Sequence, residues 1–411
     1  MEKAIPEEIK EVDLLVGIPS YNHARTIKQV AQTVSAGLGK FFPEAGWILC
    51  ISDGGSTDGT PEQVKKAQIE DARLIFTSHP VHPIDKIYPP YRGILGQEKA
   101  FRTFLENAKS LKAKACCVVD PDVKSITPEW MKNLLQPIYT DGFDYVAPLF
   151  ARPKFDGTIT NSIVYPLTRA LYGRRVQQPI GGNFSFSGKL AAFYLEKAVW
   201  EDDAVRLGLD IWASTLALSG KFKVGQAHLG VKIHEAREKT SDLATMFTQV
   251  TSSVYALMGE YQDFWKGEKG SQAIPTFGDP QGMAEEPPSV NWERMVRIFR
   301  LGAKDLMEVW RKALPNESAL WLASIGRLSD GAFHFPPDLW VRLIYDFAVA
   351  YRKGSVHRDH LLKSMIPIYL GWVSCFIKEN QEASAQEVEE RIESLCRVFE
   401  EMKPYLREHW P

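Results

Sequence analysis

Two aspartates stand one residue apart at the end of an apolar run in the first third of the chain. Residues 115–119 (Ala-Cys-Cys-Val-Val) lead directly into Asp120, and Pro121 separates Asp120 from Asp122. Such a run is typical of a strand that is buried on both faces of a parallel sheet. We therefore expect both carboxylates to emerge at the strand end and point into a cleft, where they could bind a hard divalent cation that carries phosphates. An Asp-x-Asp triplet also occurs in solvated turns, so its context decides.

The elements around this triplet alternate between strand and helix. Strands are predicted at 12–18, 46–51 and 73–76, and helices at 26–38, from Pro61 onward, and at 97–110. This alternation predicts an α/β fold with a doubly wound parallel sheet, in which ligands bind beyond the carboxyl ends of the strands. The aspartate triplet and the loops after the first two strands should therefore share one edge of the sheet.

The loops after the first two strands carry side chains that suit a nucleotide. Tyr21 could lie against a base, while Asp53 and the backbone of Gly54 could hold ribose or phosphate. Equally, Asp53 could shape a tight turn, and Asn22 could cap the following helix by bonding local amides. No Gly-x-x-x-x-Gly-Lys-Ser/Thr occurs, and no Gly-x-Gly-x-x-Gly follows the first strand, which counts against a P-loop protein and a dinucleotide dehydrogenase.

Beyond Asp122 the pattern becomes mixed. We predict a strand at 144–149, a polar loop at 152–160, helices at 161–171, 189–199 and 210–218, and a strand at 222–233 that ends at His234. Gly181 and Gly182 would let the backbone approach a ligand closely, or would simply form a loop. A lone histidine at a strand end is usually structural unless a metal ion lies beside it.

The last third of the chain is predicted to be helical. A helix at 236–258 leads to a stretch rich in Gly, Pro and Glu, which favours a linker or mobile loop. Further helices are predicted at 291–312, 317–328, 337–351, 360–378 and 386–408, with aromatic residues at helical spacing that should form a core. The expected division is a sheet domain at 1–260, a linker at 261–290 and a helical domain at 291–411.

Composition narrows the class of protein. Apolar residues make up 45% of the 411 positions, and the formal net charge is -2, so no broad basic field favours nucleic acid or an anionic membrane. The start of the chain has no signal-peptide pattern and no apolar run reaches about 20 residues, so we expect a cytoplasmic protein without a membrane partner. The five cysteines show no metal-ligand spacing and are expected to be buried free thiols: Cys50, Cys116, Cys117, Cys375 and Cys396.

In their order along the chain, these motifs resemble those of nucleotide-sugar transferases of the GT-A fold. More narrowly, the sequence is similar to the retaining enzymes that make glucosylglycerate, glucosyl-3-phosphoglycerate and mannosylglycerate, the group of glycosyltransferase family 81 and its relatives. The narrower resemblance rests on residues 120–130, Arg152-Pro153, Thr160, 178–182, 208–210 and 229–234. It spans roughly residues 12 to 250 and implies a GT-A domain followed by a helical C-terminal region.

The resemblance assigns roles to individual positions. It implies that Asp122 and His234 bind Mg or Mn, with Asp120 on the donor ribose or on the water shell of the metal. The donor nucleotide would contact Pro19, Tyr21, Asn22, Asp53, Gly54, Gln97 and Asp120. The transferred sugar would lie against Gly181, Gly182, Asn183 and Asp210, and the carboxylate of the acceptor against Arg152, Thr158 and Thr160.

Three positions depart from the family pattern. His23 stands where an acid is usual, Gln97 stands in place of the lysine of a Gly-Lys-Gly, and Asn183 stands where the loop usually ends in an acid. The members of the family that use phosphoglycerate also have an arginine near the position of Thr158, and this chain does not have that arginine. Its absence disfavours a phosphorylated acceptor.

The leading expectation is a metal-dependent retaining glycosyltransferase. It would move glucose or mannose from UDP-glucose or GDP-mannose to glycerate or a similar small hydroxy acid, as in the synthesis of compatible solutes. The alternatives are a catalytically weakened nucleotide-sugar-binding paralogue that acts through protein contacts, and an inverting transferase of the family-2 type. The apolar load of the helical region also suggests a homodimer.

Overall fold

The computed structural model describes residues 9–70, 73–91, 94–198, 200, 203–234, 243–280 and 291–411. The chain divides into two compact units. The first comprises Met1–Ala151, Val176–Asp242 and Ala273–Ala284, and the second comprises Arg152–Arg175, Leu243–Gln272 and Glu285–Pro411. Each unit therefore combines segments that lie far apart in the sequence.

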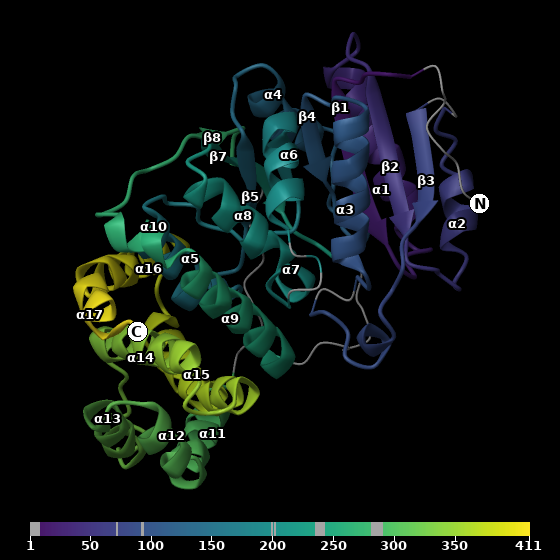
Figure 1. Cartoon of the computed structure of the whole chain (residues 1–411). Helices are drawn as coiled ribbons and strands as arrows, with labels where there is room; N and C mark the ends of the chain where they lie inside the picture. Colours follow the sequence, from purple (N-terminus) through teal and green to yellow (C-terminus); the bar gives the residue numbers. More distant parts are fainter. Residues whose placement is uncertain are drawn as a thin grey trace. The chain divides into compact units, whose positions relative to one another are not determined.

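Among the described residues, a mixed sheet of eight strands forms the centre of the first unit, in the order β3-β2-β1-β4-β6-β5-β7-β8 (Figure 1). The strands are β1 (Leu14–Ser20), β2 (Trp47–Asp53), β3 (Leu74–Ser78), β4 (Ala115–Val118), β5 (Tyr145–Ala151), β6 (Phe184–Ser187), β7 (Val224–Val231) and β8 (Thr276–Phe277). The first four strands are parallel neighbours. This half of the sheet confirms the α/β expectation.

Helices cover both faces of this sheet. The helical elements of the first unit are α1 (Ile27–Phe41), α2 (Thr60–Lys65), η2 (Pro83–Lys86), α3 (Gln97–Ser110), α4 (Glu129–Tyr139), α6 (Gly188–Lys197), α7 (Asp203–Leu207) and α8 (Leu209–Ser219). Alternate residues of β1 face opposite sides. Leu14, Val16 and Ile18 join a buried cluster with α1 and α4. On the other face, the Phe104 ring of α3 lies 2.4 Å from where a Cβ on Gly17 would be, so a side chain there would collide with it.

Strand β6 departs from the expected all-parallel sheet. It runs antiparallel to both β4 and β5, between which it lies. Phe184 and Phe186 pack against Phe101 of α3, while the Ser185 hydroxyl donates to the carbonyl of Leu134 in α4. Side chains in β6 therefore alternate between the two faces of the sheet, as in any strand. A segment of only four residues after a glycine-rich loop is too short for this alternation to predict a strand from the sequence.

The second unit is helical in its described part. Its elements are the π-helix η3 (Thr160–Val164), α5 (Tyr165–Tyr172), α9 (Leu243–Glu260), α10 (Gln262–Gly267), α11 (Trp292–Asp305), α12 (Met307–Ala313), α13 (Asn316–Gly326), α14 (Pro337–Lys353), α15 (Arg358–Asn380), α16 (Ala385–Glu401) and α17 (Lys403–His409). The helical segments expected after residue 290 are confirmed, with 291–312 and 386–408 each divided into two helices. All five cysteines of the chain are buried free thiols, as expected.

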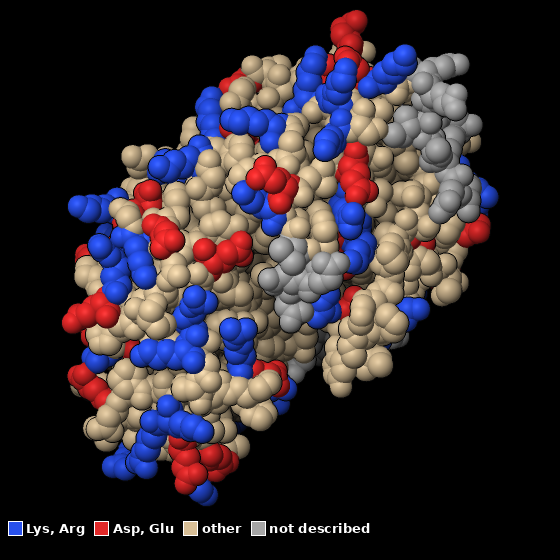
Figure 2. Space-filling model, viewed as in Figure 1, with Lys and Arg blue, Asp and Glu red and all other residues tan. Residues whose placement is uncertain are grey.

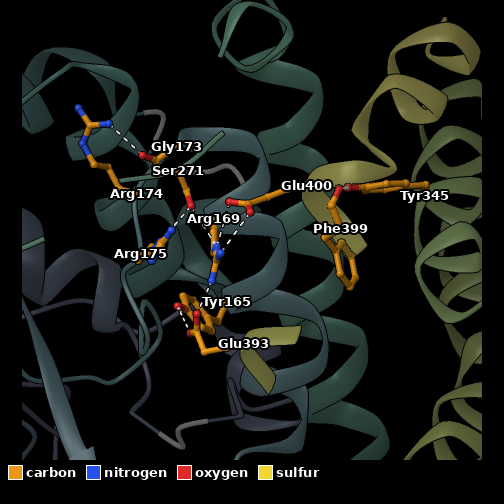
Figure 3. Close-up of polar contacts among 10 residues, drawn as sticks. All are labelled: Tyr165, Arg169, Gly173, Arg174, Arg175, Ser271, Tyr345, Glu393, Phe399 and Glu400. Carbon is orange, nitrogen blue, oxygen red and sulfur yellow. Dashed lines mark hydrogen bonds and ion pairs between the residues drawn. The ribbon is translucent and has the colours of Figure 1, made fainter. Parts of the chain in front are cut away.

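A buried arginine joins α5 to α16 (Figure 3). The Arg169 side chain is 2% exposed, and its guanidinium donates to both carboxylate oxygens of Glu400 on α16, with Nε 2.9 Å from Oε1 and Nη2 3.2 Å from Oε2. It also pairs with Glu393, which accepts a 2.6 Å hydrogen bond from the Tyr165 hydroxyl. These acids lie more than 220 residues beyond Arg169 in the chain.

Such contacts explain why the units do not follow the expected division at residues 260 and 290. Residues 152–175 and 243–260, expected in the sheet domain, pack with the C-terminal helices instead. The described part of the expected linker holds α10 and β8, and β8 pairs with β7 in the sheet. The remainder of that linker, 281–290, lies outside the described residues, as do residues 236–242 of the helix expected at 236–258.

Within the described part of the chain, α15 is the one helix long and apolar enough to cross a membrane by length and composition alone. Its most apolar window is 72% buried inside the protein. Trp340 of α14 stacks on Trp372 of α15 with ring centroids 5.2 Å apart, and Phe247 of α9 packs on Tyr369. Helix α15 therefore packs as a core helix of the second unit.

Charged side chains of both signs are interspersed over the face shown in Figure 2. This mixture agrees with the near balance of 49 Lys and Arg against 51 Asp and Glu in the sequence.

Candidate donor and metal site

The carboxyl ends of β1, β2 and β3 are level with one another. Ser20 pairs with Asp53, and Asp53 pairs with Ser78, in parallel register. Strand β4 lies on the other side of β1, also parallel, and Asp120 follows it by two residues. The loops that carry the predicted donor-site residues therefore start from one edge of the sheet, as expected from the sequence.

Side-chain hydrogen bonds hold the loops after β1 and β2 together. The Asp53 carboxylate accepts from the amides of Gly55 (3.0 Å) and Ser56 (2.8 Å) and from the Ser56 hydroxyl (2.6 Å). The Ser56 hydroxyl oxygen accepts from the Asn22 amide (2.7 Å), and Asn22 Oδ1 accepts from the Thr57 amide (2.9 Å). Asp53 thus shapes the turn, which is the structural role that the sequence left open beside ligand binding. Asn22 does not cap the following helix as the alternative had it, because its side chain bonds the loop after β2 instead.

The other residues predicted around the nucleotide lie in or next to these loops. Pro19 is buried within β1, opposite Ser52 of β2, and Tyr21 is half-buried in the loop that follows β1. Gly54 follows β2, where an added Cβ would lie 2.9 Å from Val81 Cγ2. Gln97 is buried at the first position of α3, the helix that follows the third parallel strand.

Asp120 is enclosed rather than pointing into an open cleft. It is 3% exposed, because two side chains cover its carboxylate. Asn183 accepts from the Asp120 amide through Oδ1 (2.8 Å) and donates to Asp120 Oδ2 through Nδ2 (3.3 Å). The Lys232 ammonium donates to the same Oδ2 (2.9 Å) and to the carbonyl of Gly181 (2.7 Å). This arrangement corrects the expectation of an outward-pointing Asp120 and unites it with the Gly181 loop.

Asp122 and His234 lie side by side although 112 residues separate them. His234 Nδ1 is 3.2 Å from Asp122 Oδ1, and Asp122 is 5% exposed, so it too is more enclosed than expected. A short antiparallel pairing brings the two segments together: Val123 bridges to His234, and the Lys124 amide donates to the carbonyl of Ile233 (2.8 Å). The distant pair named from the sequence is therefore adjacent.

This pair suits a divalent cation that is bound mainly through its substrate. Among the described residues, no group of three or more His, Cys, Asp or Glu side chains is placed to hold a metal ion. One carboxylate and one imidazole nevertheless fit Mg or Mn, because such ions commonly take one or two protein ligands and complete their shell with phosphates and water. Asp120, with its Oδ2 bonded to Lys232, remains a predicted third participant.

The residues predicted to border the sugar converge on one loop. A Cβ on Gly181 would lie 2.1 Å from Cγ of Pro148, and Gly182 has φ +93, so both positions favour glycine. Asp210 is 3% exposed in the first turn of α8. One turn further on the same face, the Ser214 hydroxyl lies 3.4 Å from the carbonyl of Pro179, which places α8 against this loop.

The residues predicted to bind the acceptor belong to the second unit. The Thr158 hydroxyl bonds that of Tyr369 on α15, and Thr160 is 1% exposed at the start of η3. Arg152 lies against Gly157, whose φ is +67, with Nη1 2.4 Å from where a Cβ would be. Their role toward an acceptor stays a prediction.

Lys232 is the site residue that sequence reasoning missed. The sequence predicts it only as part of the motif at 229–234, with no role of its own. In extended chain, residues two apart lie on the same face. The two-residue spacing from Lys232 to His234 was therefore a signal that could have placed the ammonium beside the predicted metal ligand.

Residues 15–201 match the model of a family described as Glycosyl transferase family 2. None of the curated proteins compared matches this sequence.

Among solved structures, the chain is similar to glucosyl-3-phosphoglycerate synthase from Mycobacterium tuberculosis. A complex of that enzyme with Mn²⁺, UDP and glucosyl-3-phosphoglycerate shares 21% identity, with 60% of this chain and 80% of that chain covered and a TM-score of 0.44. A complex with Mg²⁺ and UDP shares 21% identity over the same shares, with a TM-score of 0.45. A complex with Mn²⁺, UDP-glucose and glycerol 3-phosphate shares 22% identity over the same shares, with a TM-score of 0.40.

The family-model match and the observed sheet agree on the nature of the first unit. The matched residues include β1 to β6 and the loops that carry Asp53, Asp120 and Asn183. Residues 15–201 are similar to glycosyltransferase family 2, the first unit has the GT-A fold, and a helical C-terminal region accompanies it.

Proposed function

We propose that this protein is a metal-dependent, retaining glycosyltransferase that uses a nucleotide sugar as donor. The observation that carries the proposal is the contact of Asp122 with His234 at the edge of the sheet where the Asp53 loop also begins. A bound Mg or Mn would neutralise the charge that develops on the diphosphate leaving group. The protein side chains would orient the donor and exclude water from it.

The residues around the pair would divide this work. The Lys232 ammonium lies 2.9 Å from Asp120 Oδ2 and places a positive charge beside this buried carboxylate. Asn183, which bonds both the amide and the carboxylate of Asp120, would hold the Gly181–Gly182 loop close to the sugar. In the retaining mechanism that we propose, the acceptor hydroxyl attacks on the face from which the diphosphate departs, and a diphosphate oxygen takes its proton.

For the acceptor we propose glycerate or a similar small hydroxy acid, with glucose or mannose as the transferred sugar. A guanidinium and hydroxyl groups, which Arg152, Thr158 and Thr160 supply, are groups that bind a carboxylate. A cytoplasmic location and a homodimer are further expectations, and size-exclusion chromatography coupled to light scattering would test the second.

Activity is tested by incubating the protein with UDP-glucose or GDP-mannose, Mn²⁺ and glycerate, followed by assays of nucleotide release and of the new glycoside. We expect a product whose anomeric proton, observed by NMR, shows the configuration of the donor. Asp122→Asn, which keeps the shape but removes the charge, should abolish turnover. No nucleotide release across a panel of donors and hydroxy acids would overturn the proposal, and an inverted product would favour the family-2-like alternative.

A second candidate is a nucleotide-sugar-binding protein that has lost catalysis. The engagement of the Asp120 carboxylate by Lys232 and Asn183 favours it, since that carboxylate is less available to a ligand. Tight nucleotide binding without turnover of any donor would support this candidate, whereas turnover that disappears in Asp122→Asn would reject it.

A further inference from the structure

A buried histidine joins the loops on the two sides of the candidate donor site. His79 directly follows β3 and is 5% exposed. Its amide donates to the carbonyl of Asp53 (3.0 Å), its Nδ1 lies 3.0 Å from the Ser52 hydroxyl, and its Nε2 lies 2.9 Å from the carbonyl of Leu95. One residue therefore bonds the end of β2 and also the far end of the loop that leads to α3.

The chemistry of these partners fixes the protonation of the ring. A carbonyl oxygen only accepts, so Nε2 carries the hydrogen that is donated to Leu95. Nδ1 of the neutral ring then accepts from the Ser52 hydroxyl. Burial, the largest influence, lowers the pKa of His79 and so favours this neutral form, although its hydrogen bonds and the nearby Asp53 act in the opposite direction.

Two glycines make room for the imidazole. A Cβ on Gly54 would lie 3.0 Å from His79 Nε2, and a Cβ on Gly96 would lie 2.7 Å from His79 Cδ2. Gly96 also has φ +68, a conformation that favours glycine. The ring is thus enclosed between the loop that follows β2 and the residue that precedes α3.

The two loops that His79 joins face different parts of a nucleotide in the proposed function. Asp53 lies on the side that we expect to hold the base or ribose. Helix α3 starts at Gln97, which stands in place of the lysine that the resemblance implies for binding the nucleotide or its diphosphate, and we take this side as the diphosphate side. The first-turn amides of a helix also favour anions, which suits this second side. A ligand that contacts both sides requires their spacing to be fixed.

We propose that His79 is a positioning residue for the donor: its amide bond to Asp53 and its ring bond to Leu95 set the spacing between the nucleoside side and the diphosphate side of the site. The inference rests on the proposed function. It assigns to His79 no contact with the ligand itself.

Two substitutions separate the hydrogen bonds of the ring. In His79→Gln, the amide nitrogen can replace Nε2 as donor to the carbonyl of Leu95. In His79→Asn, the shorter side chain can replace Nδ1 as acceptor from Ser52 but cannot reach Leu95. We expect His79→Asn to weaken the Mn²⁺-dependent binding of a nucleoside diphosphate by about tenfold, which corresponds to roughly one hydrogen bond. His79→Gln should keep most of the affinity of the unsubstituted protein.

The experiment is isothermal titration calorimetry with UDP, GDP and ADP in the presence of Mn²⁺, repeated with the nucleoside of whichever diphosphate the unsubstituted protein binds best. If His79 sets the spacing of the two sides, His79→Asn should weaken the binding of the diphosphate. The nucleoside contacts one side only, so its affinity should change by no more than about twofold. Equal weakening of both ligands, or unchanged binding of the diphosphate, would overturn the role of His79. If the unsubstituted protein binds none of the diphosphates, the proposed function fails as well.

Circular dichroism and thermal melting of each variant provide the check on folding. If His79→Asn does not fold, the two single variants Ser52→Ala and His79→Gln test the proposal instead. Each of them removes only the hydrogen bond at Nδ1 of His79. Both should then bind the diphosphate within about threefold of the unsubstituted protein. A larger loss in these folded variants would contradict the assignment of the spacing to the Leu95 bond.

Discussion

Lys232 and Asp120 form an ion pair whose two side chains are only 11% and 5% exposed, with Nζ 2.9 Å from Oδ2. The same ammonium donates to the carbonyl of Gly181 and lies 4.9 Å from the centre of the Phe150 ring. The pair connects the segment after β4 with the segment after β7, which also carries His234. The Lys232 ammonium therefore connects the metal side of the candidate site with its sugar side.

Removing the Lys232 ammonium should destabilise the folded protein. Lys232→Met leaves Asp120 buried without its charge partner and should lower the free energy of unfolding by about 3–5 kcal/mol, as measured by urea denaturation at pH 7. The double variant Asp120→Asn/Lys232→Met should be more stable than the sum of the two single effects predicts, by at least about 1 kcal/mol. Effects that simply add would show that the two side chains are not coupled.

Gly96→Ala should both strain the backbone and displace His79. The positive φ alone costs about 1–2 kcal/mol for an alanine, and the new Cβ would also lie 2.9 Å from the carbonyl of Pro80. Gly39→Ala is the matched control, because Gly39 lies in α1 with no atom within 4 Å of the new Cβ, and it should stabilise the protein by up to about 1 kcal/mol. Similar melting temperatures for the two variants would contradict the close packing of Gly96 against His79.

Arg169→Met tests what holds the second unit together. The substitution leaves Glu393 and Glu400 without the guanidinium between them and should reduce the free energy of unfolding by about 3–5 kcal/mol. Lys363→Met removes an exposed partner of Asp359 within α15, where the two side chains are 63% and 52% exposed, and should change stability by less than about 1 kcal/mol. Equal effects of the two substitutions in denaturant titrations would show that burial of Arg169 confers no special stability.

Glu400 should make stability depend on pH. Burial acts to raise its pKa, but hydrogen bonds from Arg169 and Ser271 outweigh burial and hold the pKa below the ordinary value of 4.5. Because the folded protein binds this proton less readily than the unfolded chain, the stabilisation is complete above pH 4.5 and is lost as pH falls through the lower, folded pKa. The advantage over Glu400→Gln should be about 1.5–3 kcal/mol at pH 7 and should shrink in acid. A difference in stability between the unsubstituted protein and Glu400→Gln that stays constant from neutral to acidic pH would contradict the ionised state of Glu400.

Local patterns predicted much of the fold. The helix expected at 97–110 is α3 with the same limits, and the first strands and the C-terminal helices appear near their expected positions. These elements are long or strongly periodic, so their type follows from neighbouring residues alone. The division into units did not follow from the sequence, because it depends on contacts such as those of Arg169, whose two acidic partners, Glu393 and Glu400, are more than 220 residues away.

The candidate site was predictable where a motif marked it. Asp122 and His234 were paired through a resemblance, and the structure places them in contact. His79 has no motif around it, and its role appears only when Ser52, Leu95 and the two glycines are seen to surround it. The enclosure of Asp120 was missed for a related reason, since its covering residues Asn183 and Lys232 come from two later, separate segments.

The most direct test of the central claim is the thermal stability of the protein with nucleoside diphosphates, measured with and without Mn²⁺. At about 100 times its dissociation constant, the preferred nucleotide should stabilise the unsubstituted protein by about 2.7 kcal/mol in the presence of Mn²⁺, and by clearly less without it. Asp122→Asn and His234→Ala should each lose the Mn²⁺-dependent part. Stabilisation that is absent for UDP, GDP and ADP alike, or that survives unchanged in both variants, would contradict the assignment of this site to a metal-bound nucleotide sugar.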